Sequence, residues 1–274
     1  MMERFFFYLV VIFYLTSSVF LIYFFVKLND IFLNYSKKAL ILGFVFHLIN
    51  FFIRFYKAKH FPVTTLYEAL TFFALVIIFF QILIDIKYKA KGICAFSIFF
   101  STFLMIIAIF LPCKITNLPP SLQSIWLPLH VIFSFMGNGM FAIACGIGIL
   151  YLIQLKFLKN KKLSVLFFRL PSLETLDNLN YLCISIGFPL LSFGIITGSI
   201  WASQAWGSYW SWDPKETWSL ITWFVYAALL HGRINARWRG KKSAIFSIIG
   251  FCVVLFTFLG VNLLLPGLHT YANR

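Results

Sequence analysis

The sequence predicts an all-α membrane protein with about eight transmembrane helices and both termini on the outer side. Of its 274 residues, 61% are hydrophobic and only 11% are charged, so the chain has more apolar surface than a soluble core can bury. Its apolar runs reach the roughly 20 residues that a helix needs to cross the hydrocarbon layer. They lack the alternating polarity of barrel strands, which favours helices.

Eight apolar runs are the predicted spans, and each is bounded by Lys or Arg, by proline or by a polar cluster. The first follows Glu3 and Arg4 and lacks the small-x-small cleavage site of a secretory signal, so we predict a retained helix. In order, the spans cover residues 5–26, 37–56, 65–86, 92–111, 129–155, 181–200, 214–232 and 244–265.

Local signals set several of these boundaries. The third span begins in the capping box Thr65-Leu66-Tyr67-Glu68, in which we expect Glu68 to be a structural cap. The fifth follows Pro128, and the eighth stops at Leu265-Pro266-Gly267. The seventh begins with Asp213-Pro214-Lys215-Glu216, which places Asp at the N-cap, Pro at N1 and Glu at N3.

The basic residues predict the orientation. If the spans alternate in direction, 16 of the 23 Lys and Arg lie on one side, in residues 27–38, 86–92, 156–180 and 233–243. Such a bias marks cytoplasmic loops, so both termini are predicted to lie outside. Because the basic residues sit in short loops between the spans, the +15 net charge does not indicate nucleic acid, and we expect membrane lipid as a partner. Residues 156–180, basic and then amphipathic, are predicted to lie along the cytoplasmic lipid surface.

We expect a single membrane domain over residues 1–274, because the sequence contains neither a repeat nor a soluble domain. The five cysteines contain no C-x-x-C pair, which argues against a thiol relay or a zinc site and favours apolar fillers of helices. They are Cys94, Cys113, Cys145, Cys183 and Cys252.

Residues 206–218 read WGSYWSWDPKETW and lie between the sixth and seventh spans. Gly207 and Ser208 break the preceding helix, leaving residues 201–213 as an interfacial connection. An aromatic belt at the membrane surface explains one or two aromatic residues per helix end, but not this number. We therefore predict an aromatic platform for a planar apolar ligand, such as a porphyrin or a quinone. Its neighbourhood contains Trp201, Trp206, Tyr209, Trp210, Trp212, Trp218 and Trp223.

The histidines favour a porphyrin. His130 follows Pro128 and His269 follows the stop after the last span, so both are predicted on the face of the tryptophan-rich segment. Two histidines beside an aromatic platform suit the two axial positions of a haem iron. His231 lies 17 residues after Pro214, about 26 Å from the outer end and near the cytoplasmic boundary. Of the remaining two, His47 is interpreted as a hydrogen-bonding residue inside a span and His60 as a loop residue.

WGSYWSWDPKETW, with histidines before and after it, resembles the tryptophan-rich WWD domain of haem-handling proteins. Most of the chain is similar to the CcsA/ResC family, the membrane subunit of a two-component cytochrome c synthase. The similarity is strongest in GSIWASQAWGSYWSWDPKETW and FLGVNLLLPGLHTYA. It extends to LPLHVIFSFMGNGMFAIA and HFPVTTLYEAL.

The resemblance implies a haem b substrate, with His130 and His269 as axial ligands at the catalytic outer site. His231 would ligate haem at an inner site, where a CcsB-type partner subunit supplies a second histidine. The acceptor would be the C-x-x-C-H motif of apocytochrome c, joined to haem by two thioether bonds. The outer wall would consist of Trp201, Trp206, Trp210, Trp212 and Trp218, next to Asp213.

The same resemblance implies a bacterial inner membrane with the active face in the periplasm, or alternatively a thylakoid membrane. Three other functions stay open on the residues alone. The chain could be a haem carrier without ligase chemistry, a quinone-binding redox subunit, or an interaction subunit with an ordinary aromatic belt.

Overall fold

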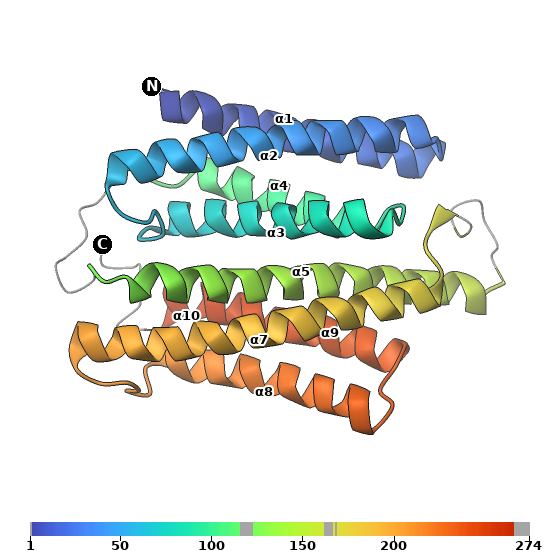
Figure 1. Cartoon of the computed structure of the whole chain (residues 1–274). Helices are drawn as coiled ribbons and strands as arrows, with labels where there is room; N and C mark the ends of the chain where they lie inside the picture. The colour runs from blue at the N-terminus through green and yellow to red at the C-terminus, as the bar shows by residue number, and fades with distance from the viewer. Residues whose placement is uncertain (1, 116–122, 162–166, 168, 266–274) are drawn as a thin grey trace. The chain divides into compact units, whose positions relative to one another are not determined.

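The computed structural model describes residues 2–115, 123–161, 167 and 169–265. Every regular element in these residues is helical, which confirms the predicted fold class (Figure 1). In chain order they are α1 (Met2–Lys27), α2 (Asp30–Ala58), α3 (Leu66–Tyr88), α4 (Ala95–Ile109), α5 (Trp126–Lys159), α7 (Leu173–Trp206), α8 (Pro214–Asn235), α9 (Lys241–Leu255), the π-helical turn η2 (Phe256–Gly260) and α10 (Val261–Leu264).

Each of the eight predicted spans coincides with a helix. Among the described residues, six helices are long and apolar enough to cross a membrane: α1, α2, α3, α5, α7 and the continuous helix Lys241–Gly260, which consists of α9 and η2. The other two are α4, a shorter apolar helix of 15 residues, and α8, a more polar helix of 22 residues. The chain is therefore a polytopic membrane protein.

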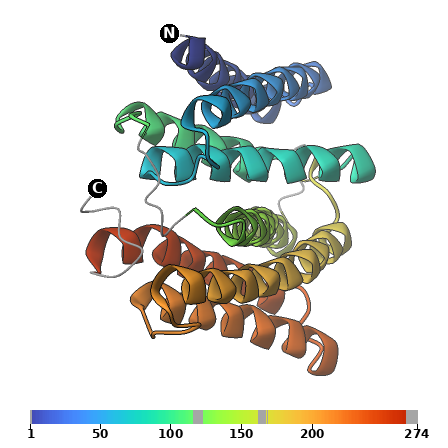
Figure 2. The same ribbon diagram turned by 60° about the vertical axis from the view of Figure 1, so that its left-hand side comes forward.

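The helices form two compact units. The first consists of Met1–Asn117 and Leu152–Thr175, and the second of Leu118–Tyr151 and Leu176–Arg274. The long helices α5 and α7 each pass from one unit into the other. Figures 1 and 2 show the antiparallel hairpin of α1 and α2 in the first unit, and α7, α8 and α9 in the second.

Polar pairs join α1 to α2 in the first unit. Ser17 and Ser36 each donate from Oγ to the other's backbone carbonyl, at 2.9 and 2.8 Å. His47 lies fully inside the unit, with Nδ1 3.1 Å from the hydroxyl of Tyr14, so the interpretation of this residue as a helix-to-helix hydrogen bond is confirmed. Small and polar residues of this kind are the usual contacts between helices in a membrane.

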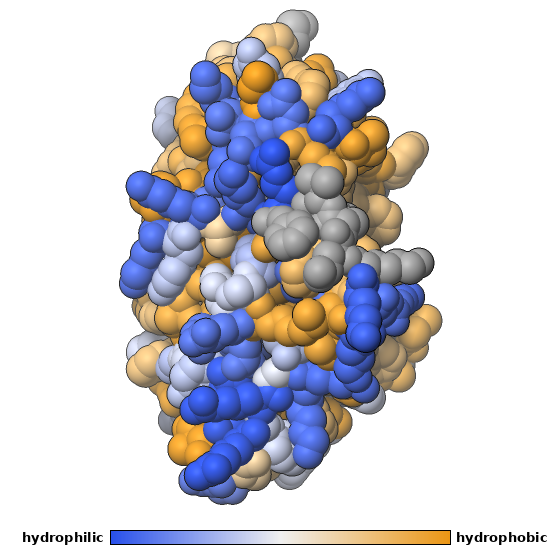
Figure 3. All heavy atoms as spheres, turned by 90° about the vertical axis from the view of Figure 1, so that its right-hand side faces the viewer, coloured by the Kyte–Doolittle hydropathy of each residue, from blue (hydrophilic) through white to orange (hydrophobic). Residues whose placement is uncertain are grey.

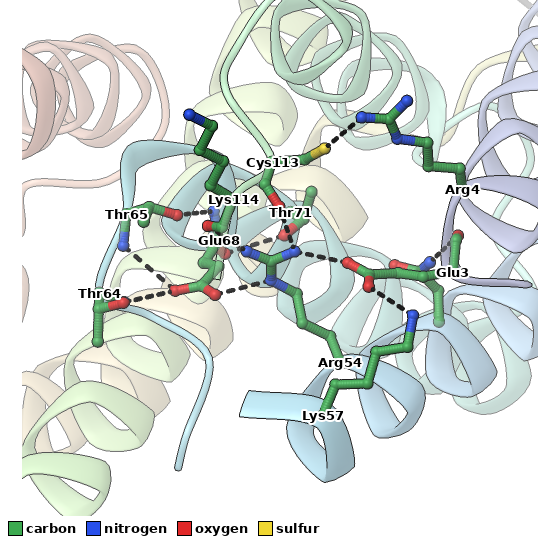
Figure 4. A network of polar contacts seen from close by, with 11 residues as sticks. Glu3, Arg4, Arg54, Lys57, Thr64, Thr65, Glu68, Thr71, Cys113 and Lys114 are labelled. Atoms are coloured by element: carbon green, nitrogen blue, oxygen red, sulfur yellow. Dashed lines mark hydrogen bonds and ion pairs between the residues drawn. The ribbon is translucent and has the colours of Figure 1, made fainter. Parts of the chain in front are cut away.

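A buried ion network closes one end of the first unit (Figure 4). The Arg54 guanidinium, 3% exposed, donates to Glu68 Oε1 at 2.7 Å and to Glu3 Oε1 at 2.5 Å. It also donates to the backbone carbonyls of Cys113 and Lys114, at 3.0 and 3.1 Å. The network therefore joins α1, α2, the start of α3 and the segment that follows α4.

Glu68 is the cap that the sequence predicts, and it also takes part in this network. Its Oε2 accepts from Thr64 N and Thr65 N, while Thr65 Oγ1 accepts from Glu68 N, which completes the capping box. Its Oε1 binds Arg54. One carboxylate thus satisfies the first turn of α3 and neutralises a cation from another helix.

In the second unit, Asn180 of α7 connects three helices. Its amide donates to Ala144 O of α5 at 2.7 Å and to Ser247 Oγ of α9 at 3.0 Å. At the end of α8, Arg233 forms a bidentate ion pair with Asp177, at 2.6 and 2.8 Å. Asp177 also accepts from the backbone of Gly240, before α9. These contacts hold the start of α7, the end of α8 and the start of α9 together.

The prediction that residues 156–180 lie along the lipid surface is wrong at both ends, since residues 156–159 belong to α5 and the last third belongs to another helix. Residues 162–166 and 168 of this segment lie outside the described residues. Residues from Leu173 onward belong to α7 and not to a surface segment, because Ser172 Oγ accepts from Thr175 N and caps the helix there. Leu176, Leu179 and Asn180 are buried. Figure 3 looks onto helix ends, where hydrophilic side chains gather and hydrophobic ones flank them.

Candidate functional site

The start of α8 is built as the sequence predicts. Asp213 is the N-cap and Glu216 completes a capping box, with Pro214 in the first turn. Glu216 Oε2 also accepts from Ser211 N at 2.8 Å, from Ser211 Oγ at 3.2 Å and from Asp213 N at 3.2 Å. This carboxylate therefore holds the end of the tryptophan-rich loop as well as capping the helix, which sequence reasoning did not anticipate.

The tryptophan-rich loop is shorter than predicted. α7 continues to Trp206, because residues 201–206 contain neither Gly nor Pro, and it ends before Gly207, which takes the left-handed φ of 78°. The connection is thus residues 207–213, and Trp201 stands on the helix itself. Ser199 Oγ donates to Tyr209 O at 2.8 Å and ties the loop back onto α7.

His130 lies in the second turn of α5, against the end of α7. Its ring is nearly parallel to that of Trp201, at 14° with 6.1 Å between centroids. Trp206 meets Trp201 edge-on, at 5.1 Å. Nδ1 of His130 lies 2.7 Å from the backbone carbonyl of Gly194, and a carbonyl oxygen can only accept, so Nδ1 carries a hydrogen. In the neutral ring the lone pair is then on Nε2, the nitrogen that would face a metal.

The remaining tryptophans of the predicted platform have contacts of their own in the loop and on α8. Trp210 and Trp212 meet edge-on at 5.8 Å in the loop. Trp212 has a left-handed φ of 57° and is 69% exposed. Trp218 packs on Phe256 of η2 at 4.4 Å. Trp223, deeper in α8, donates from Nε1 to Ser192 Oγ at 2.8 Å and joins α8 to α7.

The structure brings together His130, Trp201 and Trp206, all at one end of the second unit. His231 is near the opposite end of α8, as the rise along the helix predicts, and its side chain is exposed. Asn235 lies one turn later, with Nδ2 3.1 Å from Nδ1 of His231. His269 lies outside the described residues, so its place as the second outer ligand stays a prediction. Within the described residues, no cluster of three or more His, Cys, Asp or Glu could hold a metal ion.

Comparison with known proteins gives a consistent result. The family model described as "Cytochrome C assembly protein" matches residues 63–269. "Cytochrome c biogenesis protein CcsA" of Pyropia yezoensis is 39% identical over 257 residues, covering 80% of this chain and 81% of the relative. The protein of the same description from Guillardia theta is 40% identical over 243 residues, with 80% and 79% covered.

A solved structure, "Cytochrome c Heme Lyase CcmF", superimposes with a TM-score of 0.71 at 15% identity. The match covers 94% of this chain but only 46% of the longer protein, so at this identity it shows a shared fold. The sequence matches carry the assignment. The chain belongs to the cytochrome c assembly protein family, as a CcsA-type protein of cytochrome c biogenesis.

Proposed function

We propose that the chain is the membrane subunit of a cytochrome c synthase, which exports haem and attaches it to apocytochrome c together with a CcsB-type partner. The observation that carries this proposal is the placement of His130. A backbone carbonyl engages its Nδ1, and its ring lies along Trp201. Haem is a planar apolar substrate whose iron takes imidazole nitrogens at its axial positions, and these residues suit both properties.

In this proposal haem lies between His130 and His269 at the outer face. Trp201 and Trp206 form one part of its wall, while Trp210 and Trp212 belong to the loop that Glu216 holds in place. Trp218, placed against Phe256, adds the part contributed by α8. Asp213 contributes indirectly, because as the N-cap it fixes where the loop ends.

The covalent step is an addition without net oxidation. Each thiol of the C-x-x-C-H motif adds across one haem vinyl group: the S–H bond and the π bond break, and a C–S and a C–H bond form. The protein's contribution is mainly position, since a correctly oriented reacting pair can lower the barrier by several kcal/mol, up to about 7–11. The histidine of the motif then replaces one axial ligand, and the product leaves.

The first test replaces His130 and His269 with glycine in the chain co-produced with its partner and an apocytochrome. We expect each variant to lose the absorbance spectrum of haem with two histidine ligands and to give less covalent cytochrome. His60→Gly is the matched control, because this histidine lies before α3, in the other unit. Wild-type ligation and cytochrome yield in both variants would show that the outer site is assigned wrongly.

The same preparation separates the alternatives. Bound haem with no covalent product would identify a haem carrier. Absence of haem together with a response to added quinone would identify a redox subunit. The proposed location is a bacterial inner membrane with the active face in the periplasm, with a thylakoid membrane as the alternative.

We propose His231 as the inner ligand, because it is exposed on α8 and thus open to a histidine of the partner. Asn235 donates from Nδ2 to Nδ1 of His231, which places the ring hydrogen on Nε2. Ligation through Nε2 therefore requires the amide to turn over, so that its oxygen accepts from Nδ1.

The second test is His231→Gly. We expect less haem at the outer site, because haem enters at the inner site, and added imidazole should restore part of it by replacing the missing ligand. Asn235→Ala is the paired variant, since it removes the hydrogen-bond partner of the His231 ring but leaves the ring itself in place. Unchanged haem content in His231→Gly would exclude the inner site at this residue.

A further inference from the structure

Helices α5 and α7 approach each other along a series of glycines. Gly187, Gly194 and Gly198 of α7 recur at intervals of seven and four residues, so they lie on one face of the helix. A Cβ atom on Gly187 would lie 2.6 Å from the ring of Phe141, and one on Gly194 would lie 2.5 Å from Ser134 Oγ. Both distances are shorter than real Cβ contacts, so a methyl group at either position would require the facing residue of α5 to shift.

Gly198, the last of these glycines, faces His130, the proposed outer ligand. A Cβ atom on Gly198 would overlap Nδ1 of His130 and lie 2.7 Å from its Cε1. One turn earlier, the carbonyl of Gly194 accepts the hydrogen of the same Nδ1 at 2.7 Å. The space at Gly198 admits the imidazole, and the carbonyl at Gly194 determines which way it points.

Together with Trp201, these two residues leave the ring little freedom. The hydrogen bond fixes rotation about the Cβ–Cγ bond and keeps the hydrogen on Nδ1. Trp201, nearly parallel at 14°, limits tilting of the ring plane. In metal sites, a partner on the second ring nitrogen orients the imidazole and makes it a better ligand, and its loss typically lowers metal affinity about 10–100-fold.

We propose that Gly194 and Gly198 are positioning residues for the outer histidine: Gly194 through its carbonyl, which holds Nδ1–H so that Nε2 is presented as a ligand, and Gly198 through the absence of a side chain. This inference rests on the proposed function, in which His130 binds haem iron. It assigns to a backbone carbonyl the orienting task that a carboxylate side chain performs in many metal sites.

The test is Gly198→Ala in the complex with the partner subunit. We expect haem at the outer site to be held about 10–100-fold more weakly, because the methyl group displaces the ring from the Gly194 carbonyl. Added imidazole should restore the spectrum, as it would for a histidine that no longer reaches the iron. Gly187→Ala is the matched control: it places the same methyl group on the same face of α7, but against Phe141.

The outcomes are distinguishable. If Gly198→Ala holds haem like the wild type while His130→Gly loses it, the positioning inference is wrong and the proposed function stands. If His130→Gly keeps wild-type ligation, the proposed function itself fails. If Gly187→Ala loses haem as severely, and imidazole rescues neither variant, the effect is general packing and the inference is overturned.

A second measurement observes the hydrogen bond in the wild-type chain itself. Nitrogen NMR of the wild-type chain with labelled histidine, assigned by comparison with His130→Gln, reports the tautomer of His130 before haem binds. We expect the hydrogen on Nδ1. A ring with its hydrogen on Nε2 would contradict the proposed hydrogen bond and overturn the inference.

Discussion

Arg54→Met is expected to lower the free energy of unfolding by about 3–5 kcal/mol, because it removes the cation from a buried ion network. Glu68, with a side chain 0% exposed, would keep its charge but lose the partner of Oε1. Glu3, 12% exposed, would lose the shorter of its two ion pairs. Two backbone carbonyls after α4 would lose their donors as well.

The measurement is unfolding of the purified chain in mixed micelles of a mild detergent and dodecyl sulfate. Lys57→Met is the control, because this lysine pairs with the same Glu3 but has a side chain 38% exposed, where an ion pair contributes about 0–1 kcal/mol. Glu68→Gln, which keeps the shape of the side chain, should fall between the two. Equal stability of Arg54→Met and Lys57→Met would contradict a charged network at this position.

Arg233→Leu is expected to cost about 3 kcal/mol of stability, at the lower end of the range for a broken buried ion pair. Its guanidinium holds Asp177 through two hydrogen bonds and lies 4.9 Å from the ring centre of Tyr181. Asp177 would retain Gly240 N as a donor, which limits the loss. Because His231 is two residues away, the variant should also lower delivery of haem to the outer site.

A double-variant cycle tests this pair. Asp177→Leu combined with Arg233→Leu should be closer to the wild type than either single variant, because no uncompensated charge remains. Arg239→Leu, an exposed arginine between α8 and α9, should change stability by less than about 0.5 kcal/mol. Additive losses in the double variant would mean that the two side chains stabilise the unit independently.

The spans could be predicted because their signals are local. Twenty apolar residues in a row select a membrane helix without knowledge of any partner. The starts of α3 and α8 can also be predicted from the sequence, because a capping box involves residues only three apart. The start of α7 was missed because Leu173 opens a polar first turn, which composition alone does not separate from a surface segment.

The parts that sequence reasoning missed depend on residues far apart in the chain. No local pattern marks Arg54 as the centre of an ion network, because its partners Glu3 and Glu68 lie 51 and 14 residues away. Trp218 contacts Phe256 and Trp223 donates to Ser192, and no local pattern indicates partners that are 38 and 31 residues away. The orientation of His130 depends on a backbone carbonyl 64 residues later, which side-chain patterns do not reveal.

The π-helical turn η2 affects how related sequences should be aligned. Val261 N donates to Phe256 O, five residues back, so the turn contains one residue more than an α-helical turn. Each residue of an α-helix turns by about 100°, so Val261–Leu264 are rotated by about that angle relative to an uninterrupted helix. An alignment that treats Lys241–Leu264 as one regular helix would assign its last turn to the wrong face. A one-residue gap within Phe256–Gly260 is therefore the expected difference between relatives with and without this turn.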